Sequence, residues 1–70
     1  MCEILKKYES ILRNDSVMLW LIENFDRLLF NEIKEYLFKL GIKEEDVPAI
    51  LECLRNNKNE FYDNYDNLFN

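Results

Sequence analysis

Residues 17–40 read VMLWLIENFDRLLFNEIKEYLFKL, and this stretch decides the fold class. Its apolar side chains recur every three or four positions, which is the period of an α-helix. Most of them lie within about 80° of the direction of Met18 on a helical wheel: Leu21, Ile22, Phe25, Leu28, Leu29, Ile33, Tyr36 and Leu40. The pattern predicts either one long helix or two helices with a break near Phe30–Asn31.

The same period continues on both sides of this stretch. It predicts a helix over residues 2–13, a helix that begins at Asp46–Pro48, and a helix over residues 59–69. Gly41 is expected to end the central helix, and Asp15 or Ser16 to cap its start. The cluster Asn56–Asn59 leaves open whether the last two helices are joined. The predicted core contains Ile4, Tyr8, Ile11, Met18, Leu21, Ile22, Phe25, Leu29, Tyr36, Leu40, Val47, Ile50, Leu54, Phe61 and Tyr65.

The composition restricts the fold to one small helical domain. The chain has 70 residues with one Gly and one Pro, too few turn residues for a multistranded sheet. No apolar run reaches the ~20 residues that a membrane span needs. We therefore predict an all-α bundle of three to four helices that occupies residues 1–70 and forms an oligomer.

The cysteines and the first residues indicate in which cellular compartment the protein is expected. Cys2 and Cys53 are 51 positions apart, which argues against a disulfide scaffold and predicts free thiols. The first residues do not resemble a secretory signal. The expected location is the cytoplasm, or the host cytoplasm if the protein is viral.

Some large apolar side chains fall outside the predicted core stripe. Trp20 and Phe38 lie on the reverse face of the central helix, where they are either covered within the monomer or part of an interface. A chain this small hides little surface, and aromatic residues are enriched at contact centres. The predicted protein interface consists of Trp20, Phe30, Phe38, Tyr62 and Phe69.

The negative charge is concentrated in the last third of the chain. Residues 1–43 have seven acidic and seven basic side chains, whereas residues 44–70 have seven acidic and two basic ones, which accounts for the net charge of −5. This acidic surface either keeps the domain soluble or contacts a basic partner. The residues assigned to it are Glu44, Glu45, Asp46, Glu60, Asp63 and Asp66.

Catalytic chemistry has little support. The chain has no His, the commonest general base at neutral pH, and its paired carboxylates have ordinary surface spacing. A single Gly excludes a glycine-rich phosphate loop. We predict no enzyme activity, no catalytic residue, no cofactor and no metal site.

The resulting prediction is a small, acidic, non-enzymatic protein-binding module. It acts as an adaptor or inhibitor of another macromolecule, is suited to a viral or phage accessory protein, and binds itself as a homodimer, another protein, or both. The alternative is a helix-turn-helix transcriptional regulator formed by residues 31–56. Its recognition helix would begin Glu44-Glu45-Asp46, which phosphates repel. Neither nucleic acid nor a membrane is an expected partner.

Overall fold

The computed structural model describes residues 2–70, and these residues form helices and turns. The all-α prediction is confirmed, but the predicted three or four helices are divided into shorter ones. The α-helices and two 3₁₀ helices are α1 (Glu3–Lys7), α2 (Glu9–Leu12), α3 (Asp15–Asn24), α4 (Phe30–Lys39), η1 (Glu44–Asp46), α5 (Val47–Asn56), α6 (Lys58–Asp63) and η2 (Tyr65–Phe69).

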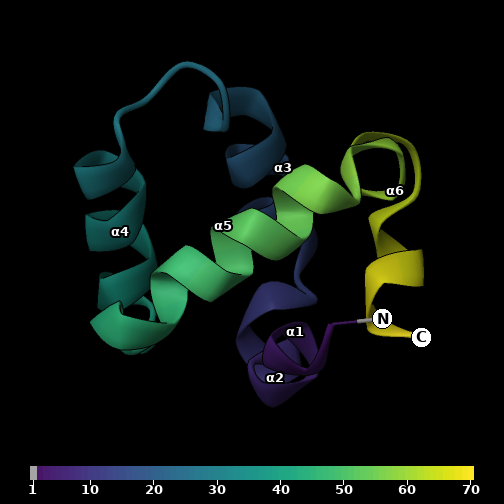
Figure 1. Ribbon diagram of the computed structural model, residues 1–70, viewed down its shortest axis with the longest axis horizontal. Helices are drawn as coiled ribbons and strands as arrows, with labels where there is room; N and C mark the ends of the chain where they lie inside the picture. Colours follow the sequence, from purple (N-terminus) through teal and green to yellow (C-terminus); the bar gives the residue numbers. More distant parts are fainter. Residues whose placement is uncertain (1) are drawn as a thin grey trace.

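Helix α5 crosses the middle of the molecule (Figure 1). Helix α4 lies at one end of α5 and α6 at the other, so these two helices are on opposite sides of the protein. Helix α1 packs against both α5 and η2, which brings the two ends of the described chain together. The fold therefore separates an α4 side from an α6 side.

The predicted helix over residues 2–13 is interrupted at Tyr8. Its backbone leaves the helical region (φ −110°, ψ 23°), and the side chain is buried against the core. The Tyr8 hydroxyl reaches across to Asp46 and to the backbone of Lys43. We attribute the interruption to these tertiary contacts, which the local pattern does not contain.

The central stretch is broken, earlier than the predicted position at Phe30–Asn31. Helix α3 ends at Asn24, whose side-chain amide donates to the Trp20 carbonyl oxygen at 2.8 Å. Helix α4 then begins at Phe30, with Glu32 accepting from the Leu29 backbone N–H at 3.5 Å. Leu29 is consequently 73 % exposed, so its assignment to the core is wrong.

Caps fix the ends of these helices. Asn14, rather than the predicted Asp15 or Ser16, caps α3 by accepting from the Ser16 and Val17 N–H groups. Gly41 follows α4 with φ +105°, as predicted. The Gly41 N–H bonds the Phe38 carbonyl and the Ile42 N–H bonds the Leu37 carbonyl, which together form a Schellman motif. This motif turns the chain sharply from α4 into η1.

The C-terminal region also differs from its prediction. Helices α5 and α6 are separate, with Asn57 between them at φ −123° and ψ 43°. The helix predicted over residues 59–69 is divided at Asn64 into α6 and η2. This bend turns Phe69 inward, where it is 4 % exposed. Its assignment to the protein interface is therefore wrong in the folded monomer.

The core gathers side chains from all six α-helices. Eight of the predicted core residues are buried, namely Tyr8, Met18, Leu21, Phe25, Val47, Ile50, Leu54 and Phe61. Six more are only partly buried, namely Ile4, Ile11, Ile22, Tyr36, Leu40 and Tyr65. Buried residues outside the predicted core are Leu5, Leu12, Val17, Ile33, Leu37, Ile42, Leu51, Cys53, Leu68 and Phe69. Ile33 lies on the apolar stripe of residues 17–40, whereas Val17 and Leu37 extend the buried face beyond that stripe.

Cys2 and Cys53 form a disulfide, with their Cα atoms 6.4 Å apart. The prediction of free thiols is therefore wrong. The separation of 51 positions said nothing about distance in space, and the packing of α1 against α5 brings the two residues together. The expectation of a cytoplasmic location loses the support that it drew from free thiols.

Candidate functional site

A hollow in the described part of the surface lies beside α4. It is open, has a volume of about 730 Å³, and is bounded by Phe30, Lys34, Phe38, Lys43, Glu44, Glu45 and Pro48. We call these seven residues the α4–η1 surface. Phe30, Lys34 and Phe38 follow at intervals of four and so share one face of α4. The Gly41 turn places η1 next to that face.

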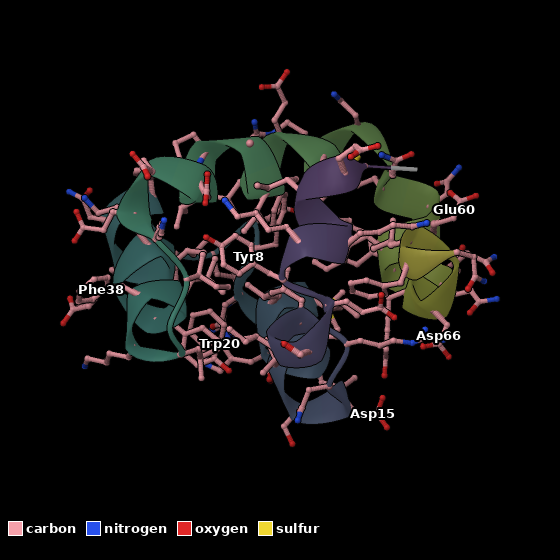
Figure 2. All side chains as sticks on the ribbon, turned by 90° about the horizontal axis from the view of Figure 1, so that it is seen from below. Tyr8, Asp15, Trp20, Phe38, Glu60 and Asp66 are labelled. Atoms are coloured by element: carbon pink, nitrogen blue, oxygen red, sulfur yellow. A yellow bond between two sulfur atoms is a disulfide. The ribbon has the colours of Figure 1, made fainter. Side chains whose placement is uncertain are left out.

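The apolar part of the α4–η1 surface is two phenylalanines. Phe30 is 45 % exposed and Phe38 is 55 % exposed. Figure 2 shows Phe38 directed away from the body of the protein. Exposed side chains of this size are normal one at a time, but two on one helix face beside a hollow are typical of a contact surface. An interface residue must be accessible in the free subunit, so both residues remain candidates for the predicted interface.

The charged part of the α4–η1 surface is balanced. It contains two basic residues, Lys34 and Lys43, and two acidic residues, Glu44 and Glu45. Within residues 2–70, none of these four forms an ion pair, whereas Lys7, Arg13, Lys39 and Lys58 all do. The helical wheel could have identified Lys34, because it lies midway between the two phenylalanines.

Trp20 lies inside the fold more than at its surface. Its ring stacks on that of Tyr36, with ring centroids 3.7 Å apart and planes 14° apart. Trp20 is partly buried and borders a shallow hollow together with Leu28 and Tyr36. This stack joins α3 to α4. Burial of Tyr36 raises the pKa of its hydroxyl above the ordinary value. The stack on Tyr36 therefore favours the alternative in which Trp20 is covered within the monomer over the one in which it forms an interface.

The predicted acidic surface is divided between two sides of the molecule. Glu44 and Glu45 belong to the α4–η1 surface. Glu60 and Asp66 lie on the opposite side from Phe38 (Figure 2). Asp66 there approaches Arg13 at 3.7 Å, and Tyr62, 36 % exposed, donates to Asp26 at 3.0 Å. Asp63, exposed at the end of α6, is on this second side as well.

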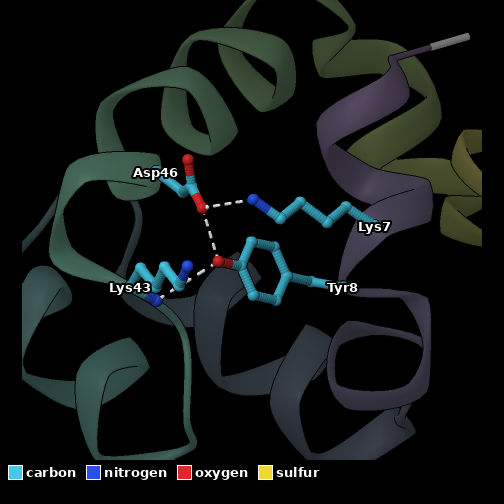
Figure 3. A network of polar contacts seen from close by, with 4 residues as sticks. All are labelled: Lys7, Tyr8, Lys43 and Asp46. Carbon is cyan, nitrogen blue, oxygen red and sulfur yellow. Dashed lines mark hydrogen bonds and ion pairs between the residues drawn. The ribbon is translucent and has the colours of Figure 1, made fainter.

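Asp46 does not belong to a free acidic surface. Its carboxylate accepts hydrogen bonds from the Tyr8 hydroxyl at 2.5 Å and from the Lys7 ammonium at 3.0 Å (Figure 3). The Tyr8 hydroxyl in turn accepts from the Lys43 backbone N–H at 3.3 Å. This network ties α1 to η1 and therefore supports one edge of the α4–η1 surface.

The network changes the acidity of its members. Hydrogen bonds from Tyr8 and then from Lys7 hold the pKa of Asp46 below its ordinary value. The bond to Asp46 raises the pKa of Tyr8, and the same carboxylate raises the pKa of Lys7. All three shifts favour a charged Asp46 beside a protonated Tyr8 and Lys7.

We expect the Asp46 network to make the protein less stable in acid. Because folding lowers the pKa of Asp46, its contribution to stability is present above the unfolded pKa and is lost as the pH falls through the folded pKa. Tyr8→Phe removes the largest cause of that shift. The variant should unfold at lower urea concentration at neutral pH and lose less stability on acidification than the parent.

The control for this prediction is Tyr62→Phe. It removes a similar hydroxyl–carboxylate bond, between Tyr62 and Asp26, at an exposed position. The control should change the free energy of unfolding less than Tyr8→Phe at neutral pH. Urea titrations from acid to neutral pH measure both variants, and parallel profiles for Tyr8→Phe and the parent would contradict the prediction.

Residues 2–70 contain neither a metal-binding cluster nor a membrane-spanning helix. No three His, Cys, Asp or Glu side chains there are grouped to hold a metal ion. None of the helices in this range is both long and apolar enough to cross a membrane. The described residues form an all-helical domain with a partly apolar, charge-balanced hollow beside α4. No known protein family, curated protein or solved structure matches the chain.

Proposed function

We propose that the chain is a small non-enzymatic protein-binding module, and that it contacts its partner through the α4–η1 surface. The observation that supports this most is the exposure of Phe30 and Phe38 on one face of α4, beside a hollow of about 730 Å³. A cavity bordered by large aromatic groups can take an apolar side chain of a partner, and the surrounding charges can fix its orientation.

The acidity of η1 argues against the alternative of DNA binding. In a helix-turn-helix reading, α4 and α5 are the two helices, and the N-terminal part of α5 enters the major groove. Glu44 and Glu45 precede that end and are exposed. They would lie near phosphates, so we do not propose DNA binding.

The proposed function predicts that Phe38→Ser weakens partner binding. Truncation of an aromatic residue at the centre of an interface costs about 2 kcal/mol, roughly 30-fold in affinity. The chain is immobilised, proteins from its source cells are captured, and the affinity of each purified candidate is measured for the parent and the variant. Circular dichroism should remain helical, because Phe38 is exposed.

The matched control is Tyr62→Ser, an exposed aromatic side chain on α6 at the other end of α5. It should leave partner affinity close to that of the parent. Equal binding by Phe38→Ser and the parent would contradict the proposal. Selective loss in Tyr62→Ser would place the contact on the α6 side instead.

A further inference from the structure

We infer that the occupant of the α4–η1 surface is a second copy of this chain, bound across a twofold axis. This inference rests on the proposed function, because it assigns a partner to the same surface. It is supported by the charges around the hollow and by the placement of the two phenylalanines along α4.

The charge pattern of the α4–η1 surface is complementary to itself. In a twofold contact the same patch meets its own copy, so each charge must find an opposite charge within that patch. Lys34 and Lys43 supply two positive charges, Glu44 and Glu45 supply two negative ones, and none of them has an ion-pair partner within residues 2–70. A second copy can pair Lys34 of each subunit with Glu44 or Glu45 of the other.

The rest of the molecule is less suited to self-association. The net charge is −5, so two copies repel one another over most orientations. The α4–η1 surface has a local net charge of zero, since two Lys offset two Glu. The α6 side, with Glu60, Asp63 and Asp66, is acidic and would repel its own copy. Electrostatics therefore favours contact between copies at α4 and η1.

The phenylalanines suit an antiparallel pair of α4 helices. Phe30 and Phe38 are eight residues apart, or about 12 Å along a helix axis at 1.5 Å per residue. When two α4 helices lie antiparallel across a twofold axis near Lys34, Phe38 of one subunit meets Phe30 of the other at both ends of the contact. In this arrangement the long side chain of each Lys34 must extend away from the axis, toward Glu44 or Glu45 of the other subunit. Each apolar group then loses its contact with water, which is the main favourable contribution to association.

A contact of the size that association requires takes a small share of the protein surface. A small specific interface buries about 600 Å² on each partner, near the lower limit for stable association. The accessible surface of the protein is 4469 Å², so such a contact takes roughly one-seventh of it. We therefore expect a weak dimer, whose population depends on protein concentration.

The first measurement is the mass of the disulfide-bonded chain in solution. Sedimentation equilibrium from ~1 μM to ~1 mM covers the range in which a weak interface associates. We expect the mass to rise from 8.6 kDa toward twice that value. Phe38→Ser should keep the chain monomeric over most of this range, whereas Tyr62→Ser should associate like the parent.

The second measurement identifies the charge pairs. Lys34→Glu and Glu45→Lys should each weaken self-association at least ~10-fold, because like charges meet across the axis. An equimolar mixture of the two should associate more strongly than either variant alone, since one opposite pair is restored and the other is retained. Lys6→Glu, on α1, makes the same charge change away from the surface and should associate like the parent.

The outcomes separate this inference from the proposed function. A parent chain that stays at 8.6 kDa up to ~1 mM overturns the inference, while the capture experiment with Phe38→Ser still decides whether another protein binds there. A dimer that is insensitive to Phe38→Ser, Lys34→Glu and Glu45→Lys overturns it too, because that dimer uses another face. Circular dichroism and urea titration verify that each variant is folded.

Discussion

Loss of the disulfide between Cys2 and Cys53 should lower the free energy of unfolding by about 4 kcal/mol at 25 °C. The bond closes most of the chain into one loop, with a sequence separation of 51. Cross-linking a loop of that length restricts the unfolded chain strongly, and the restriction disappears when the bond is absent. Small domains are stable by only about 5–15 kcal/mol, so this loss removes much of the total.

Urea unfolding with and without dithiothreitol measures this effect. Cys2→Ser is the matched variant, because Cys2 is only partly buried whereas Cys53 is 5 % exposed. The variant should resemble the reduced parent, and dithiothreitol should not change its stability further. The prediction would be contradicted if the purified, unreduced parent contained two reactive thiols. It would also be contradicted if the oxidised and reduced forms unfolded at the same urea concentration.

Some of the fold could be predicted from periodicity alone. The spacing of Val47, Ile50 and Leu54 fixed the inner face of α5, and all three are buried. Gly41 was the one residue suited to a left-handed turn, and it takes φ +105°. The helical wheel placed Phe38 on the reverse face, either covered within the monomer or part of an interface, and the fold leaves it 55 % exposed. These features depend on neighbours within one or two helical turns.

The features that periodicity missed depend on distant parts of the chain. The interruption at Tyr8 accompanies hydrogen bonds to Asp46 and Lys43, more than 30 positions away. The disulfide depends on the packing of α1 against α5, which no local pattern contains. The inward turn of Phe69 follows from the bend at Asn64. A pattern that treats each helix alone cannot contain any of these contacts.

The candidate site could be predicted only in part, because a local sequence pattern describes near neighbours and not contacts between distant residues. Phe30, Phe38, Glu44 and Glu45 are close in sequence, and the Gly41 turn keeps them close in space. The same negative charge is carried by Glu60, Asp63 and Asp66. These residues follow α5, whose length places them on the other side of the molecule. The sequence therefore showed that the last third of the chain is negatively charged. It did not show that these charges lie on two separate surfaces.

Phe61→Ala is expected to cost about 3–5 kcal/mol of unfolding free energy. Phe61 is fully buried, and its ring packs edge-to-face on Phe25 with centroids 5.2 Å apart. Truncation removes the buried ring and leaves a cavity between α6 and the turn after α3, which the surrounding side chains fill only in part. Phe25 also loses its aromatic partner.

Tyr62→Ala is the neighbouring control, because it removes an aromatic ring from the same helix at a position that is 36 % exposed. Its cost should be less than half that of Phe61→Ala, since water already contacts part of the Tyr62 ring. Urea titrations of the oxidised variants give both values, and similar costs for the two would show that α6 does not anchor the core. Because the loss expected for Phe61→Ala is comparable to the contribution of the disulfide, reduction of this variant should leave the chain largely unfolded. The covalent bond at α1 and the aromatic contact at α6 therefore stabilise the same cooperative unit.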